Sequence, residues 1–124
     1  MCSQGNLQER RKNTVMIVSL DRPLGDRRKQ ALEKAGIPAF VVYEVEGVSS
    51  ACNQHHPRAV VFGRSLPPAE KRRAWLQVRN ACHVPIIELF EHDVPEEMPA
   101  AYLHQLATPD DFVDTVKKLL KRRR

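Results

Sequence analysis

Residues 57–67 read PRAVVFGRSLP and divide into an apolar run, a short polar loop and a proline. The run at residues 59–62 is apolar throughout, which is typical of a strand buried on both faces of a parallel sheet. Pro67 and Pro68 follow the loop, and proline is favoured in the first turn of a helix because its missing N–H would have no helical partner there. The stretch therefore predicts a buried strand, a loop and the start of a helix.

The alternation of apolar strands and helical segments continues on both sides of this stretch. Further strands are expected at residues 14–20, 39–43, 84–90 and 102–106. Helices are expected from Leu24 to Ala35, around Val48 to Cys52, after Pro68, and from Thr108 and Pro109 onward. The helix after Pro68 is expected to bury Trp75 and to expose Lys71 and Arg72. We predict an α/β fold with a five-stranded parallel sheet and helices on both faces.

Length and composition suit one ordinary globular domain. The chain has 124 residues, of which 42% are apolar, enough for a single core. No apolar run approaches the roughly 20 residues of a membrane helix, and residues 1–13 lack the apolar segment of a secretory signal. We expect a flexible leader at residues 1–13, the domain at 14–121, a basic tail or start of a linker at 122–124, and a cytoplasmic location without membrane contact.

The cysteines and histidines form no recognisable site. Cys2, Cys52 and Cys82 are an odd, widely spaced set without a CxxC motif, which fits a reduced cytosolic protein better than a disulfide or zinc framework. Cys52 and Cys82 are interpreted as core residues, because a catalytic cysteine needs an activating neighbour. His55 and His56 match no ligand spacing. We expect no metal and no cofactor.

The order and spacing of the elements resemble the receiver domain of response regulators over about residues 14–120. Residues 57–67 resemble the strand and loop that carry the family's phosphoacceptor aspartate. VPII at residues 84–87 resembles its fourth strand, and residues 102–103 with TPDDF at 108–112 resemble its fifth strand and the start of its last helix. The resemblance implies a CheY-like, flavodoxin-like, doubly wound fold.

The same resemblance implies that the phosphorylation machinery is replaced. A working receiver carries a phosphoacceptor aspartate, an acidic pair that binds magnesium through oxygen ligands, a switch hydroxyl and a lysine. These positions fall, in that order, on Gly63, on Ser19 and Leu20 with Asp21 one residue further on, on Phe90 and on Gln105. A non-phosphorylatable pseudo-receiver, with no catalytic residue of its own, is implied.

The segment before the last strand is unusually short for a receiver. Residues 91–101 are all that separates Phe90 from Tyr102, and they include Pro95 and Pro99. Proline in a helix interior costs about 3 kcal/mol. We expect the family's fourth helix to be shortened or missing, and because receivers pass on their signal through this face, the partner surface should differ.

The leading interpretation is a protein-interaction module in bacterial signalling or transcriptional control that works without phosphorylation. The last helix is expected to present Lys117, Lys118 and Lys121 to an acidic protein partner or to a second copy of the domain. The alternative is a nucleic-acid-associated role, because the net charge is +5 and basic clusters recur along the chain. A small enzyme is disfavoured, because no nucleophile–base pair or phosphate loop lies at the strand ends, where such folds bind ligands.

Overall fold

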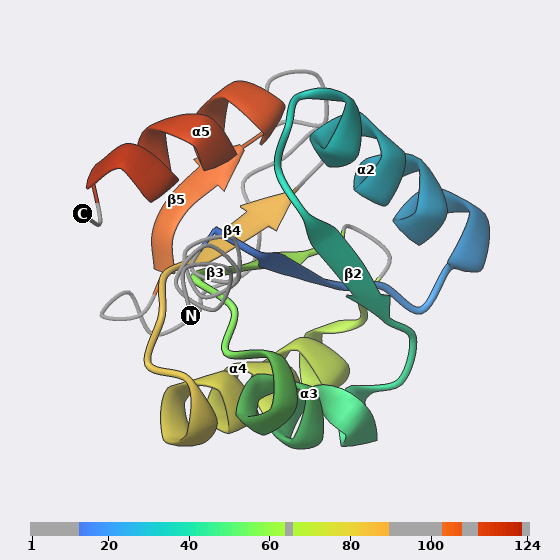
Figure 1. Cartoon of the computed structure of the whole chain (residues 1–124). Helices are drawn as coiled ribbons and strands as arrows, with labels where there is room; N and C mark the ends of the chain where they lie inside the picture. Colours follow the sequence, from blue (N-terminus) through green and yellow to red (C-terminus); the bar gives the residue numbers. More distant parts are fainter. Residues whose placement is uncertain (1–12, 64–65, 90–102, 108–111, 123–124) are drawn as a thin grey trace.

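The computed structural model describes residues 13–63, 66–89, 103–107 and 112–122. Its elements, labelled as in Figure 1, alternate along the chain. They are β1 (Val15–Val18), α2 (Arg22–Lys34), β2 (Ala39–Val42), the 3-10 turn η1 (Val45–Gly47), α3 (Val48–His55), β3 (Ala59–Phe62), α4 (Pro68–Ala81), β4 (Ile86–Leu89), β5 (Leu103–Ala107) and α5 (Phe112–Arg122).

The strands form one sheet in the order β2-β1-β3-β4-β5, and every neighbouring pair is parallel. β3 lies at the centre of this order, as expected for its uninterrupted apolar sequence. Val18 at the end of β1 pairs in register with Val42 on one side and with Phe62 on the other. The parallel α/β architecture predicted from the alternating pattern is confirmed.

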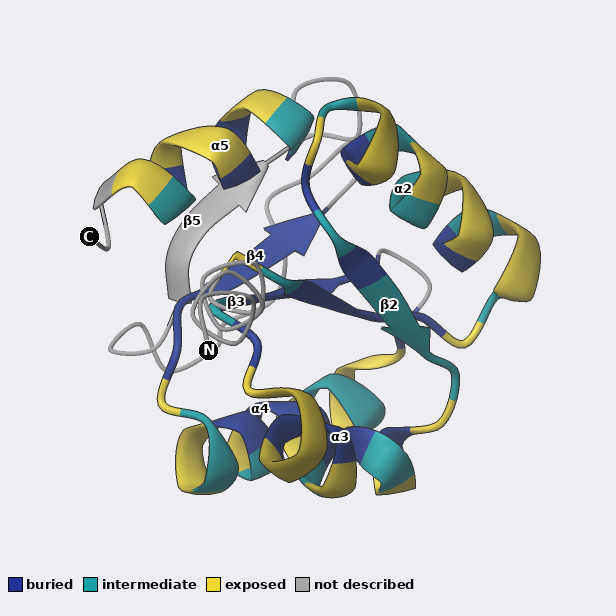
Figure 2. Ribbon diagram, in the orientation of Figure 1, coloured by how far each residue is buried: buried dark blue, intermediate teal, exposed yellow. Residues whose placement is uncertain are grey.

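Helices cover both faces of the sheet, with α3 and α4 on one face and α2 and α5 on the other (Figure 1). Successive strand residues point to opposite faces, so the strands contribute to two separate cores. Met16, Val60 and Phe62 join Trp75 and Val78 beneath α3 and α4. The second core, beneath α2 and α5, is built from Val15, Ile17, Val61, Ile87, Leu32, Phe112, Val116 and Leu119. Figure 2 shows the exposed residues on the outer faces of the helices.

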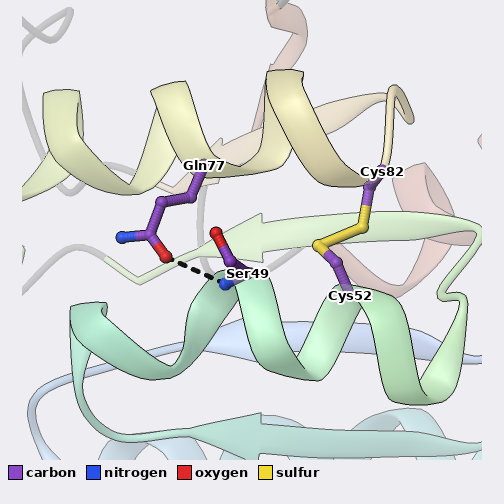
Figure 3. The surroundings of a disulfide bond; sticks show 4 residues. All are labelled: Ser49, Cys52, Gln77 and Cys82. Carbon is purple, nitrogen blue, oxygen red and sulfur yellow. Dashed lines mark hydrogen bonds between the residues drawn. A yellow bond between two sulfur atoms is a disulfide. The ribbon is translucent and has the colours of Figure 1, made fainter.

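One prediction about the α3–α4 face is wrong: Cys52 and Cys82 are not free core thiols but form a disulfide. Their Cα atoms lie 5.6 Å apart across a sequence separation of 30 residues, a distance typical of disulfides. The two helices follow parallel strands and run side by side in the same direction, which brings their C-terminal ends together (Figure 3). Spacing along the chain does not reveal this tertiary proximity.

A second prediction on this face, that Lys71 is exposed, is also wrong. Its side chain is only 13% exposed and forms an ion pair with the buried Glu88 of β4. Trp75, in contrast, is buried as predicted. Among the helices of the described ranges, none combines the length and apolar character needed to cross a bilayer.

Candidate functional site

The candidate site lies at the carboxyl ends of β1 and β3, the edge where doubly wound folds bind ligands. Because Val18 pairs with Phe62, the next residues, Ser19 and Gly63, follow adjacent strand ends. The Gly63 N–H donates to the Val18 carbonyl oxygen at 2.9 Å, and the Ser19 N–H donates to the Val42 carbonyl oxygen at 3.0 Å. The structure thus brings together two of the positions that the sequence analysis identified.

Gly63 is buried and has room for a small side chain. A Cβ atom built there would lie 3.4 Å from the Val18 carbonyl oxygen and 3.5 Å from the Cβ and Oγ atoms of Ser19. These separations are near ordinary van der Waals contact, so sterics at the Cβ do not force glycine at this position. The glycine nevertheless leaves this strand end without a carboxylate or hydroxyl of its own.

The turn after β1 engages its polar side chains in local hydrogen bonds. Ser19 is 2% exposed, and its hydroxyl donates to the Asp21 carbonyl oxygen at 2.9 Å. The Asp21 carboxylate accepts from the Leu24 N–H at 3.1 Å and so forms the N-cap of α2. Leu20 is 41% exposed and contributes no ligand atom. Of the expected acidic pocket, only Asp21 carries a carboxylate, and that group caps a helix.

These residues do not fit the magnesium site that the receiver fold implies. Magnesium is held by carboxylates, waters and phosphate oxygens in an octahedral arrangement. Ser19 and Gly63 supply no carboxylate, and Asp21 is engaged with α2. Within the ranges that the structure describes, no group of three or more His, Cys, Asp or Glu residues could hold a metal ion.

Helix α2 packs unusually close to this strand end. A Cβ atom on Gly25 would lie 2.9 Å from Val41 Cγ1 and 3.2 Å from Ser19 Cβ. The absent side chain therefore lets α2 sit directly on β1 and β2, with Ser19 beneath it. Gly25 was not singled out from the sequence, because a glycine inside a helical pattern gives no sign of what it touches.

Of the two positions that match the family's switch hydroxyl and lysine, the structure describes only the second. Gln105 lies in β5, where it pairs in register with Ile87 of β4. Phe90 and residues 91–101, which the expectation of a lost fourth helix concerns, lie outside the described residues. Lys117, Lys118 and Lys121 are exposed on α5, whose inner face contributes Phe112, Val116 and Leu119 to the core.

A buried ion pair next to the site escaped the sequence analysis. Glu88 of β4 pairs in register with Phe62, the residue before Gly63. Its carboxylate is fully buried and accepts a hydrogen bond from Lys71 Nζ of α4. Its second oxygen, Oε1, has no hydrogen-bond partner among the described residues. A glutamate inside the apolar run at residues 84–90 was the available signal, because charged residues are rarely fully buried unless paired.

An exposed cluster at the end of β2 was also missed. The Tyr43 hydroxyl donates to the Asp26 carboxylate of α2, and the Arg22 guanidinium stacks 4.2 Å from the Tyr43 ring centroid. The hydrogen bond to Asp26, followed by partial desolvation and the Asp26 charge, raises the pKa of Tyr43, while Arg22 opposes the shift. The hydrogen bond from Tyr43 ties α2 to the end of β2.

No family model and no curated protein matches the chain by sequence. Among solved structures, it is similar to the receiver domain of the Francisella response regulator 1452, with a TM-score of 0.76 and 18% identity over 90% of this chain and 99% of that one. A response regulator receiver protein from Burkholderia phymatum superimposes with a TM-score of 0.71 and 22% identity, covering 87% of this chain and 94% of that one.

A CheY-like receiver domain protein from Methanospirillum hungatei gives a TM-score of 0.71 at 19% identity, over 90% of this chain and 94% of that one. The likeness extends over nearly the whole of each chain, although few residues are identical. The receiver-like sequence pattern is thus confirmed at the level of architecture, and the chain has the CheY-like fold of response-regulator receiver domains.

Proposed function

We propose that the chain is a pseudo-receiver, a CheY-like domain that accepts no phosphoryl group and acts as a protein-interaction module in bacterial signal transduction or transcriptional control. The observation that carries this proposal is Gly63 at the end of β3 beside Ser19, where a working receiver has its aspartates. The interaction module would comprise residues 14–121, with residues 1–13 as a leader and 122–124 as a basic tail.

The chemistry of phosphorylation supports this reading. Phosphoryl transfer needs a nucleophilic oxygen and a cation that neutralises the developing charge. Gly63 has no side chain, and its N–H is bonded to the Val18 carbonyl. The Ser19 hydroxyl and the Asp21 carboxylate hold the β1–α2 turn instead. The fold would then serve as a scaffold without a phosphorylation switch.

Intact-mass measurement after incubation with acetyl phosphate and magnesium tests the first half of the proposal. The parent chain should gain no phosphoryl group. The triple variant Ser19→Asp, Leu20→Asp and Gly63→Asp restores the aspartates at the matched positions. It tests whether the fold can still support phosphorylation when they are present. A stable phosphoryl adduct on the parent chain would contradict the proposal, whatever the variant does.

The partner surface that we propose is the exposed side of α5, with Lys117, Lys118 and Lys121. Because the opposite side of this helix is buried in the core, the three lysines project outward and would attract an acidic protein surface. A homodimer through this region is the second form of the proposal.

Charge reversal separates this surface from others. Lys117→Glu, Lys118→Glu and Lys121→Glu together should abolish co-purification of the partner, or self-association measured by sedimentation, without changing the circular dichroism spectrum. The matched control reverses Lys34, Arg72 and Arg79, which are also exposed but lie on α2 and α4. Equal association of the α5 variant and the parent would exclude this surface.

The nucleic-acid alternative rests on the net charge of +5 and on the basic clusters that recur along the chain, because such a surface attracts nucleic acid. Binding through phosphate contacts weakens steeply as salt rises. A shift assay with DNA and RNA at several salt concentrations distinguishes this role from a protein partner. Strong binding at physiological salt that the α5 variant loses would favour nucleic acid over an acidic protein.

A further inference from the structure

The Cys52–Cys82 disulfide joins one end of α3 to one end of α4. Cys52 lies in the last turn of α3 and is 1% exposed, whereas Cys82 is the half-buried C-cap of α4. Figure 3 shows the bond crossing directly between the two helices. It closes a loop that contains β3, the central strand, together with Gly63.

The turns that precede the two cysteines are held together without a covalent bond. The Gln77 side chain of α4 accepts from the Ser49 N–H at 2.8 Å (Figure 3). The same side chain donates to the Val45 carbonyl oxygen at 2.8 Å. Arg73 adds an exposed ion pair to Glu46 at 3.3 Å. Opening the disulfide would therefore free the last turn of each helix, while the hydrogen bonds of Gln77 keep the preceding turns docked.

The freed end is also the end with unusual backbone. His56 and His83 follow the two cysteine-bearing helix termini, and both are non-glycine residues with positive φ, 49° and 59°. Their N–H groups close the helices by donating to the carbonyl oxygens of Cys52 at 3.0 Å and Val78 at 2.9 Å. Left-handed backbone is unfavourable for residues with a side chain, so these turns depend on surrounding contacts to persist.

We infer that Cys52 and Cys82 form a reversible thiol-oxidation site, which locks the C-terminal ends of α3 and α4 together in oxidising conditions and releases them in reducing conditions. The reactant is a low-molecular-weight thiol–disulfide couple. The pair has neither the CxxC motif nor the helix N-terminal position of catalytic dithiols. It therefore sets a structural state of this domain and does not turn over on a protein substrate.

Each direction of the reaction balances with that couple alone. In oxidation, the Cys82 thiolate attacks one sulfur of the small disulfide and expels a thiolate. The Cys52 thiolate then attacks Cys82 Sγ, forms the intramolecular bond and expels the second thiolate. The two expelled thiolates take up the two protons that the cysteines lose. In reduction, an external thiolate attacks Cys82 Sγ first, because Cys52 is buried.

Equilibration of the full chain in buffers of oxidised and reduced glutathione tests the inference, using Cys2→Ser so that only the pair reports. Alkylation and mass measurement should show no free thiol at the oxidising end and two at the reducing end. Hydrogen exchange at residues 52–56 and 78–83 should become at least tenfold faster on reduction, while α2 and α5 keep their protection. The variant with Cys2, Cys52 and Cys82 all replaced by Ser should not respond to the glutathione ratio.

Three outcomes would overturn the inference. Two thiols that remain free in excess oxidised glutathione would show that the site does not form. Equal hydrogen exchange at both helix ends in the oxidised and reduced states would show that the bond does not lock them. Unfolding of the whole domain on reduction, seen as loss of the far-ultraviolet circular dichroism spectrum, would make the bond a requirement for folding and not a switch. None of these measurements depends on phosphorylation or on a partner.

Discussion

The Glu88 carboxylate, buried in the middle of the sheet, is paired with the Nζ of Lys71 from the first turn of α4. Both groups lose most of their hydration, so the pair itself contributes little net stability. The pair instead sets the position of α4, because this helix must begin where Lys71 can reach Glu88 of β4. Glu88 pairs in register with Phe62, the residue before Gly63, so the ion pair lies next to the candidate site.

Replacing Lys71 by Met should lower the free energy of unfolding by about 3–5 kcal/mol, because it leaves a buried carboxylate without its partner. The double variant Lys71→Met with Glu88→Leu should recover most of that loss, since an apolar pair of similar size often replaces a buried ion pair without cost. Urea denaturation measures both. A Lys71→Met variant as stable as the parent would show that the pair is not buried in solution.

Gly25→Ala should destabilise the domain by about 1–3 kcal/mol, the usual range for overpacking. The added Cβ would lie 2.9 Å from Val41 Cγ1 and would push α2 away from Ser19. Gly47→Ala is the matched control, because its Cβ would meet Val42 Cγ1 at 3.5 Å, an ordinary contact. If the two variants unfold at the same denaturant concentration, α2 does not pack as closely as described.

The Tyr43–Asp26 contact predicts that Tyr43 loses its proton at a higher pH than an ordinary tyrosine. Hydrogen bonding to Asp26 is the largest cause that raises the pKa of Tyr43 in the folded chain. The stability that depends on the protonated phenol is therefore complete below the unfolded pKa of about 10 and is lost as pH rises through the higher folded value. The difference in tyrosinate absorbance between the parent and Tyr43→Phe isolates this group.

Asp26→Asn provides the control for that titration. It removes the charge and the strongest acceptor, so the pKa of Tyr43 should move back toward its ordinary value. A Tyr43 midpoint at or below that ordinary value in the parent chain would contradict the contact.

The strands were largely predictable because β1, β2 and β3 are apolar along their whole length, and β4 is apolar except for Glu88. β3 spans the predicted residues 59–62, whereas β1 ends at Val18, earlier than the predicted residue 20. The reason is local: Ser19 bonds into the turn and Asp21 already caps α2. Such hydrogen bonds decide where an element ends, and an apolar run does not encode them.

The contacts between elements were the part that sequence patterns could not supply. Cys52 and Cys82 were each correctly predicted to lie on apolar helix faces. Their separation along the sequence, however, does not indicate that the two sulfur atoms meet. The helical pattern likewise predicts that Lys71 is exposed, because it does not show that the buried Glu88 of β4 lies within reach. Gly63 was identified because the family pattern gives its position a meaning that composition and periodicity do not.

The disulfide should stabilise the domain by about 3–4 kcal/mol, the chain-entropy value for a loop of roughly 30 residues. Cys52→Ser should lose that amount in non-reducing urea denaturation, and the parent chain in excess dithiothreitol should lose the same amount. Cys2→Ser, which leaves the bond intact, should unfold like the parent in both conditions. Because small domains commonly have 5–15 kcal/mol of stability, the reduced chain should remain folded. A parent chain whose unfolding midpoint does not respond to dithiothreitol would show that the bond does not form in solution.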